Sequence, residues 1–372
     1  MLLMIPGPVQ LHERIIRAMA RQMIGHRTED FSEILQYCTE MLKKLFKTRH
    51  DVFIISGTGT AGMEAAIACF SNIRRITCID NGKFGDRLGK IALRYVKEVD
   101  IVRFEWGDSV ELEEVEKSMA EGSDAVAFVH NETSTGILNP AKEIARIAKK
   151  YDALVIMDGI TSVGGDDVRM DEWGIDVVIV GSQKCIGAPP GLCAVAVSER
   201  AWDFYSERCP FYLDLMAYRE KLSNWQTPYT PALPLFFALY EALKIIEEEG
   251  IENRIRRHRI LSEAVRTWAV EAGLELFPKL NEYSSYSNTV TAIKMPKGIS
   301  DRELRGELKR EYGILISGGQ EHLKGRIFRI GTMGNIGKGE LIMTLSALED
   351  ILLRRGIIRS ALNSAMEILR KL

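Results

Sequence analysis

In the first half of the chain, apolar residues form short continuous runs that are separated by segments with helical periodicity. Such runs are typical of strands buried on both faces of a parallel sheet. Their regular alternation with helices predicts an α/β domain with a mostly parallel sheet that ends near Ser198. The predicted strands are Val52–Ser56, Ile76–Asp80, Val99–Phe104, Ala125–His130, Leu154–Asp158, Val177–Gly181 and Leu192–Val197.

Beyond this point the pattern changes, and a turn-rich loop, Trp225–Pro234, separates the sheet from shorter units. These units predict a smaller α+β domain. We expect an N-terminal segment (1–20) that contributes to the functional site and the small domain, a large domain (21–250) and a small C-terminal domain (251–372). The remaining predicted elements are helices Leu11–Ile24, Phe31–Phe46, Leu235–Glu249, Asp301–Tyr312, Lys338–Arg354 and Ile358–Leu372, a helix ending near Ala272, and strands Asn288–Lys294 and Arg326–Ile330.

Composition and charge disfavour several functional classes but do not identify one. The net charge of -2 among 372 residues gives no bulk attraction to nucleic acid or to a membrane surface. None of the six cysteines forms a CxxC pair, so the sequence predicts no metal site. The segment Met1–Pro8 lacks the basic start of a signal peptide, and no apolar stretch is long enough to span a membrane. We therefore expect a cytoplasmic protein.

A glycine-rich loop, Gly57–Gly62, directly follows a predicted strand and opens a predicted helix. Glycines at such a turn let the backbone approach a ligand, and free N–H groups at a helix N-terminus attract a phosphate. The loop also satisfies the GxGxxG pattern of dinucleotide sites, with Asp80 ending the next strand. The loop therefore indicates a phosphate group and leaves open which cofactor carries it.

Two further strand ends carry residues that suit a pyridine-ring cofactor. Asp158 ends one apolar strand, and Lys184 follows another and precedes the turn Gly187–Gly191. Ligands of open α/β sheets bind at the carboxyl ends of strands. A carboxylate there can pair with a ring nitrogen, and a lysine amine can form an imine with an aldehyde.

With these residues, the chain resembles the class V aminotransferases that depend on pyridoxal 5'-phosphate, in the alanine–glyoxylate and serine–pyruvate branch. The resemblance covers nearly the whole chain, and it depends on the order and spacing of several motifs. The motifs are Pro6–Pro8, His26-Arg27, Ser56–Gly62, Glu132–Gly136, the Asp158 strand, Gly181–Lys184, Ala188–Gly191, Thr230-Pro231, Gly318–Gln320 and Phe328–Gly331.

The resemblance implies a role for each site residue. Lys184 is the Schiff-base lysine, Asp158 pairs with the pyridine nitrogen, and Arg329 and Gly7 contact the substrate, with the arginine holding its carboxylate. Thr230 comes from the neighbouring subunit, which implies a homodimer with shared active sites. Relatives often have histidine at Thr60, tryptophan at Phe84 and tyrosine at Thr227. The implied cofactor-binding residues are Thr58, Gly59, Thr60, Phe84, Thr133, Asp158, Gln183, Lys184 and Thr230.

The resemblance further implies fold type I and a ping-pong transamination from alanine or serine to glyoxylate or pyruvate. Aspartate and phosphoserine aminotransferases remain alternatives on the same fold. His26 and Arg27 are the candidates for a second anionic group or for simple helix caps. A cysteine desulfurase or lyase is disfavoured, because no cysteine follows Cys209 and Gln183 stands where desulfurases tend to have histidine. An NAD-dependent dehydrogenase would leave Asp158, Lys184 and Arg329 unexplained.

Overall fold

The computed structural model describes all residues, 1–372, and its largest element is a seven-stranded sheet. The strand order is β2-β10-β9-β8-β5-β3-β4, and every neighbouring pair is parallel except the two pairs made by β10. The mostly parallel sheet predicted from the apolar runs is thus confirmed. Its strands are β2 (Asp51–Ser56), β3 (Arg75–Asp80), β4 (Glu98–Arg103), β5 (Ala125–Val129), β8 (Leu154–Asp158), β9 (Val177–Gly181) and β10 (Leu192–Val197).

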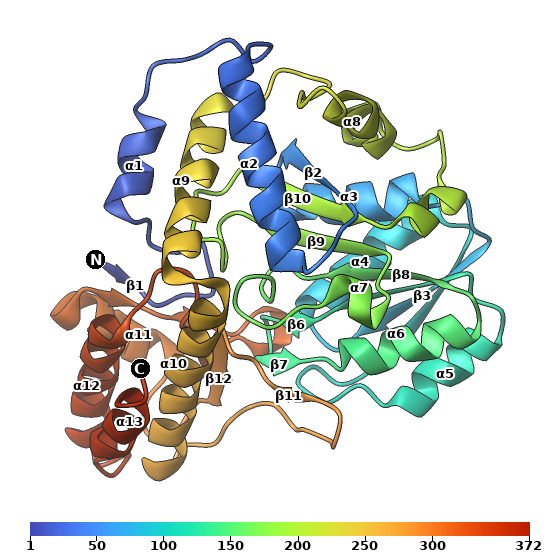
Figure 1. The fold of residues 1–372 in the computed structure, drawn as a ribbon. Helices are drawn as coiled ribbons and strands as arrows, with labels where there is room; N and C mark the ends of the chain where they lie inside the picture. The colour runs from blue at the N-terminus through green and yellow to red at the C-terminus, as the bar shows by residue number, and fades with distance from the viewer.

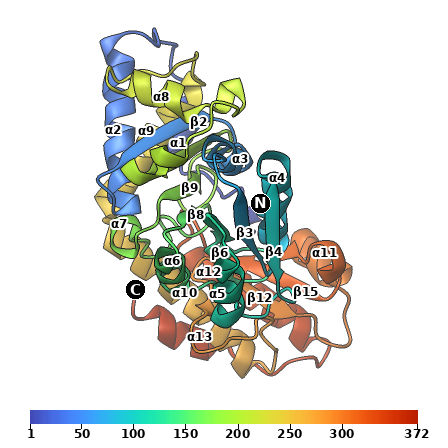
Figure 2. The same cartoon turned by 90° about the vertical axis from the view of Figure 1, so that its right-hand side faces the viewer.

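Helices cover both faces of this sheet, because successive strand residues point alternately into two cores (Figure 1 and Figure 2). In β9, for example, Val178 and Val180 join one core, whereas Val177 and Ile179 join the other. None of the chain's helices is long and apolar enough to cross a lipid bilayer. One face carries α1 (Glu13–Met19), α2 (Glu29–Phe46), α5 (Leu112–Ala120), α6 (Ala141–Lys150), α7 (Met170–Trp173) and α9 (Leu233–Glu249), and the other carries α3 (Gly59–Cys69), α4 (Lys83–Tyr95) and α8 (Leu215–Leu222).

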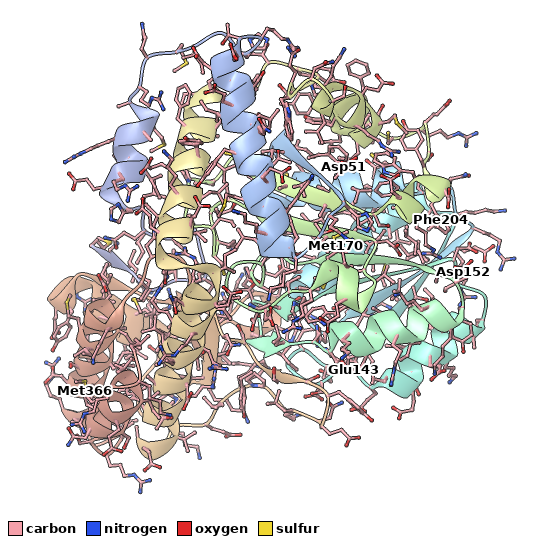
Figure 3. The ribbon with its side chains drawn as sticks, viewed as in Figure 1. Asp51, Glu143, Asp152, Met170, Phe204 and Met366 are labelled. Atoms are coloured by element: carbon pink, nitrogen blue, oxygen red, sulfur yellow. The ribbon has the colours of Figure 1, made fainter.

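The C-terminal part forms a separate core around a three-stranded antiparallel sheet. Met366 packs against this second core, whereas Met170 belongs to the core of the large domain (Figure 3). Strand β1 (Leu2–Leu3) pairs in parallel with β13 (Ile314–Leu315), so the first residues of the chain join the C-terminal part. The other elements are α10 (Ile251–Glu271), β12 (Val290–Lys294), α11 (Asp301–Tyr312), β14 (Ser317–Gly318), β15 (Ile327–Gly331), α12 (Lys338–Leu353) and α13 (Leu362–Leu369).

The structure departs from the predicted elements mainly at short or terminal segments. The predicted helix Leu11–Ile24 shrinks to Glu13–Met19, although its flanking apolar residues still pack against the core. Likewise, Ile358–Leu372 shrinks to α13. Elements of a few residues carry too little periodicity to be predicted. These elements are β6 (Asn131–Glu132), β7 (Ile137–Leu138), β11 (Ser285–Tyr286), η1 (Glu199–Phe204), η2 (Phe211–Leu213) and η3 (Glu321–Leu323).

Candidate active site

A cavity of about 210 Å³ opens at the edge of the large sheet where β2, β5, β8 and β9 end. Most of the predicted site residues line it, although they come from distant parts of the chain. Three predicted residues, Gly7, Thr230 and Arg329, are not part of its lining. The residues that line the cavity are Thr58, Gly59, Thr60, Phe84, Arg87, Val129, Asn131, Thr133, Asp158, Ile160, Thr161, Gln183 and Lys184.

Lys184 reaches into this cavity from the turn after β9, and its amine is held by the N-terminal segment. Nζ donates a hydrogen bond of 2.5 Å to the carbonyl of Pro6. Gly7 lies so close that a Cβ there would stand 2.8 Å from Lys184 Cδ, and its φ of +100° also favours glycine. Burial lowers the pKa of Lys184 to about 8, and Arg329 and Arg87 act in the same direction, opposed by Asp158. The amine is therefore prepared to act as a nucleophile or a base near neutral pH.

Asp158 is a buried carboxylate at the end of β8 that lacks a cationic partner. Its Oδ1 accepts the Ile160 N–H at 2.8 Å, and no arginine or lysine hydrogen-bonds to it. Burial therefore raises the pKa of Asp158 to about 7. A protonated ring nitrogen would supply the missing counter-charge, and this is the partner that pyridoxal phosphate offers.

The opposite end of the cavity suits a phosphate. Helix α3 begins at Gly59 with Thr58 as its N-cap, and no side chain caps it and no acidic residue occupies its first turn. Its first N–H groups are thus available to an anion. A Cβ on Gly59 would approach Ile160 Cδ1 to 2.5 Å, so a larger residue there would require the Ile160 side chain to move. Gln183 Oε1 is buried without a hydrogen-bond partner, which marks a polar position that a ligand can complete.

Arg87 is a cavity residue that the sequence motifs did not single out. Its Nη1 donates to Thr60 Oγ1 at 3.0 Å, and its guanidinium lies 4.8 Å from the centroid of the Phe84 ring. A cation therefore stands beside the position where relatives often have histidine. The sequence did contain one indication of Arg87, because it follows Phe84 by three residues, and residues three apart on a helix such as α4 share a face.

Glu132 fixes the start of α4, which presents Phe84 and Arg87. It is fully buried, and its Oε2 accepts the N–H groups of Phe84 and Gly85 at 3.0 and 3.1 Å. Its Oε1 accepts the N–H and Oγ of Ser134 at 3.1 and 2.5 Å. The carboxylate stabilises the positive end of the helix dipole and so holds the two cavity residues in place.

Arg329, on β15 of the small domain, bonds across to the large domain. Nη1 donates to the Thr133 carbonyl at 2.8 Å, while Nε and Nη2 donate to the Gly318 carbonyl at 3.0 and 2.8 Å. Burial lowers the pKa of Arg329 to about 10, which leaves the side chain charged at neutral pH. Thr133 Oγ1 lies 3.1 Å from Thr161 Oγ1, and Thr161 is a second cavity residue that the sequence did not reveal.

The structure places Thr230 on the surface, away from the cavity of its own chain. The loop that carries it is held by Arg27, whose Nη1 and Nη2 donate to the carbonyls of Thr227 and Pro228 at 2.5 and 3.3 Å. Thr227 Oγ1 in turn donates to the Tyr229 carbonyl. Arg27 is therefore committed to the loop and does not reach this cavity, and His26 also lies outside it.

Comparison with known proteins agrees with this geometry. The family described as Aminotransferase class-V matches residues 10–333. An uncharacterized aminotransferase of Methanocaldococcus jannaschii is 45% identical over 100% of this chain and 98% of its own length. The serine–glyoxylate aminotransferase of Arabidopsis thaliana is 34% identical over 94% of this chain and 90% of its length. The crystal structure of the ureidoglycine–glyoxylate aminotransferase of Bacillus subtilis has a TM-score of 0.91 and 33% identity, covering 99% of this chain and 97% of that one.

These matches span nearly the whole chain, and the lysine, the aspartate and the phosphate loop converge on one cavity. The protein has the type I fold of the pyridoxal-phosphate enzymes and the residues to hold that cofactor. It follows that the chain belongs to the class-V aminotransferase family, in its alanine–glyoxylate and serine–pyruvate branch, and is a pyridoxal-phosphate-dependent transaminase.

Proposed function

We propose that this transaminase moves the amino group of a small L-amino acid, alanine or serine, to glyoxylate or pyruvate by a ping-pong mechanism. The observation that carries the proposal is the joint presence of Lys184, Asp158 and the phosphate loop at one cavity. Glyoxylate as the acceptor is further supported by the names of the Arabidopsis and Bacillus relatives.

Lys184 and Asp158 are the catalytic residues in this proposal. When bound, pyridoxal phosphate supplies an electrophilic aldehyde and a ring that withdraws electrons. Asp158 would hold the ring nitrogen in its protonated form. Nζ of Lys184 would accept the proton from the donor's Cα, a role that a pKa of about 8 permits. The Pro6 carbonyl, 2.5 Å from Nζ, orients the amine.

The remaining cavity residues hold the cofactor. Thr58, Gly59 and Thr60 bind its phosphate at the α3 N-terminus together with Gln183, and Arg87 adds a positive charge beside Thr60. Phe84 and Thr133 contact the ring, the phenylalanine by stacking and the threonine through its hydroxyl. Phe84 stands where relatives often have the larger tryptophan, and the guanidinium of Arg87 lies over its ring.

Arg329 retains donors for a substrate carboxylate. Its three hydrogen bonds to carbonyls use three of the five guanidinium N–H groups. One N–H therefore remains on each terminal nitrogen, and each can donate to an oxygen of a carboxylate. Gly7, beside Lys184, leaves space for the substrate where a side chain would collide with the lysine.

We further propose a cytoplasmic homodimer in which Thr230 completes the partner's phosphate site. Thr230 is exposed, and Phe211, on the same surface, is 81% exposed. The rings of Phe211 and Tyr212 pack on Tyr229, the residue before Thr230. Exposed aromatic rings next to a functional loop are typical of a subunit interface. The division into 1–20, 21–250 and 251–372 is supported by the break at Gly250, between α9 and α10.

The test is to mix the purified holoenzyme with L-alanine, L-serine, L-aspartate or phosphoserine and record the visible cofactor absorbance. Alanine or serine should convert it to the pyridoxamine form, and glyoxylate or pyruvate should restore it. Two-substrate kinetics should give parallel lines. Lys184→Ala should abolish turnover, while Lys142→Ala, at an exposed lysine, should not change it. Conversion by aspartate or phosphoserine alone would reject the proposed donors, and full activity of Lys184→Ala would reject the catalytic lysine.

A further inference from the structure

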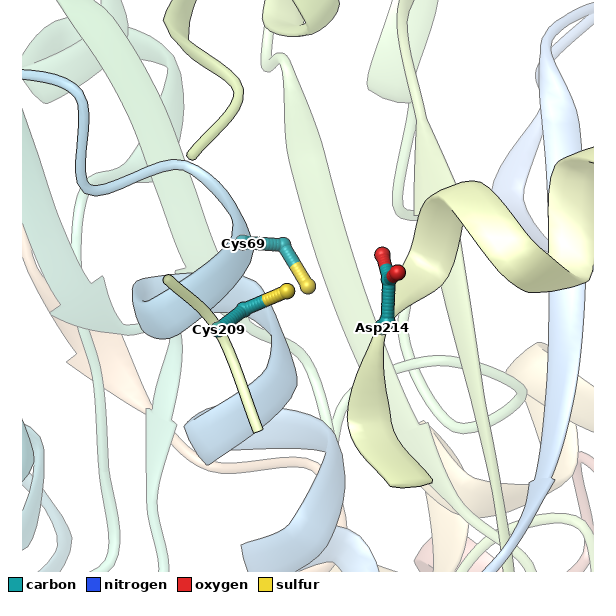
Figure 4. Close-up of side chains that lie close together, drawn as sticks. All are labelled: Cys69, Cys209 and Asp214. Atoms are coloured by element: carbon teal, nitrogen blue, oxygen red, sulfur yellow. The ribbon is translucent and has the colours of Figure 1, made fainter. Parts of the chain in front are cut away.

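Three side chains with metal-binding atoms meet on the face of the large sheet that is covered by α3 and α8. Cys69 ends α3, Cys209 lies in the segment after η1, and Asp214 is the N-cap of α8. One sulfur or oxygen atom from each lies within 4.8 Å of the other two. Figure 4 shows the two sulfur atoms next to each other and the carboxylate beside them. The cluster is separate from the cofactor cavity, whose lining includes none of these residues.

The surroundings hold the three groups in position. The Cys69 thiol donates to the Leu213 carbonyl at 3.2 Å, and its Sγ accepts the Leu215 N–H at 3.4 Å. Asp214 Oδ1 accepts the Tyr205 hydroxyl at 2.9 Å and the Met216 N–H at 3.0 Å. Both of these bonds go to one carboxylate oxygen, so Oδ2 remains available. Outer hydrogen bonds of this kind are what orient the ligands of a metal centre.

Two sulfur atoms and a carboxylate oxygen form a donor set that suits a thiophilic cation. The same carboxylate adds negative charge for a cation that two sulfur atoms would bind. Cys69 is buried and Cys209 is half-buried, so an ion could enter from the Cys209 side and keep a water molecule as its fourth ligand.

We propose that Cys69 Sγ, Cys209 Sγ and a carboxylate oxygen of Asp214 form a binding site for a thiophilic divalent cation such as Zn²⁺. Binding forms two metal–sulfur bonds and one metal–oxygen bond, and it releases the two thiol protons to solvent. The absence of a CxxC pair hid this site, because its ligands come from two distant segments of the chain.

Such a site has a structural role. It ties the C-terminal end of α3 to the segment between η1 and α8, and the N-terminal end of α3 lines the cofactor cavity. Along the sequence, Phe211 and Tyr212 lie between the ligands Cys209 and Asp214, and both rings pack on Tyr229. The bound ion should therefore stabilise the fold and the surface around Thr230 without taking part in transamination.

The test uses the holoenzyme after dialysis against a chelator, titrated with Co²⁺ and separately with Zn²⁺. Tetrahedral cobalt bound by thiolates absorbs at wavelengths longer than those of pyridoxal phosphate, so the two signals separate. We expect one equivalent of Co²⁺ per chain and a rise in the thermal unfolding temperature with Zn²⁺. Cys209→Ser should lose the cobalt band. Asp214→Asn, which keeps an acceptor for the helix cap, should weaken binding by at least roughly tenfold.

Cys38→Ser is the matched control, because Cys38 is buried in the core on the opposite face of the sheet, and it should keep the band. No cobalt band in the wild type, or a band that persists in Cys209→Ser, would overturn the proposal. A Cys69–Cys209 disulfide in the purified protein that excludes the metal, seen as a mass loss of two hydrogen atoms, would also overturn it.

Discussion

The lowered pKa of Lys184 predicts how the apoenzyme captures its cofactor as the pH changes. Only the neutral amine attacks an aldehyde. With a pKa of about 8, roughly a quarter of the amine is neutral at pH 7.5, whereas a lysine at 10.5 would be neutral in about one molecule in a thousand. Capture of pyridoxal phosphate at this pH should therefore be about two hundred times faster than for an unperturbed lysine. The rate should rise with pH up to about 8 and then level off.

Two substitutions should move this inflection in opposite directions, because Asp158 raises the pKa of Lys184 and Arg87 lowers it. Asp158→Asn should shift the inflection to lower pH, and Arg87→Gln should shift it to higher pH. The assay is stopped-flow absorbance of the apoenzyme mixed with pyridoxal phosphate at a series of pH values, with Lys142→Ala as the control. A rate that keeps rising tenfold per pH unit well above 8, or shifts of the same sign in both variants, would refute this account.

Three further predictions follow from buried polar groups. Glu132→Gln should lower the free energy of unfolding in urea by about 1–3 kcal/mol and weaken cofactor binding, because the new amide N–H₂ faces the Ser134 N–H. The control Glu111→Gln, at an exposed residue, should stay within about 0.5 kcal/mol of wild type. Equal losses in both variants would contradict this role of Glu132. Burial lowers the pKa of His130 to about 4, so the unfolded chain takes up its proton first as the pH falls through about 6.5, and stability is lost. Between pH 7 and pH 5, His130→Phe should gain about 2 kcal/mol in unfolding free energy relative to wild type; parallel pH curves would argue against a neutral buried histidine. Arg329→Lys should lower kcat/KM for the amino donor by roughly ten- to a hundredfold while the exposed Arg326→Lys does not, and an unchanged KM would exclude Arg329 as the carboxylate ligand.

The sequence predicted the large sheet well because each strand is buried on both faces and reads as an uninterrupted apolar run. Strands β8, β9 and β10 have the predicted bounds, and β2–β5 differ from theirs by at most one residue at either end. The same runs located Asp158 and Lys184, since both stand at or just beyond strand ends. Periodicity failed where an element is two residues long, as for β6 and β7, because no period can be counted there.

Residues whose role depends on contacts between distant segments were harder to predict. Arg87 and Thr161 belong to none of the recognised sequence motifs, and only the folded structure shows that they line the cavity. Glu132 stood inside a recognised motif, yet its partners, the N–H groups of Phe84 and Gly85, lie far from it along the chain. Almost every residue carries a backbone N–H, so a hydrogen bond from a backbone N–H cannot be predicted from the type of the residue that donates it.

The site depends on contacts between the N-terminal segment and both domains. Met4 accepts the Gly331 N–H of β15 at 2.8 Å, and two residues later Pro6 accepts the amine of Lys184. Arg329, on the same strand β15, donates to Thr133 of the large domain. A shift of the small domain relative to the large sheet would therefore move the lysine's acceptor and the carboxylate ligand together. The Pro6 carbonyl lies in the segment that is bonded to β15, and Arg329 lies on β15 itself. A movement of β15 would therefore change the position of the base and the position of the substrate together.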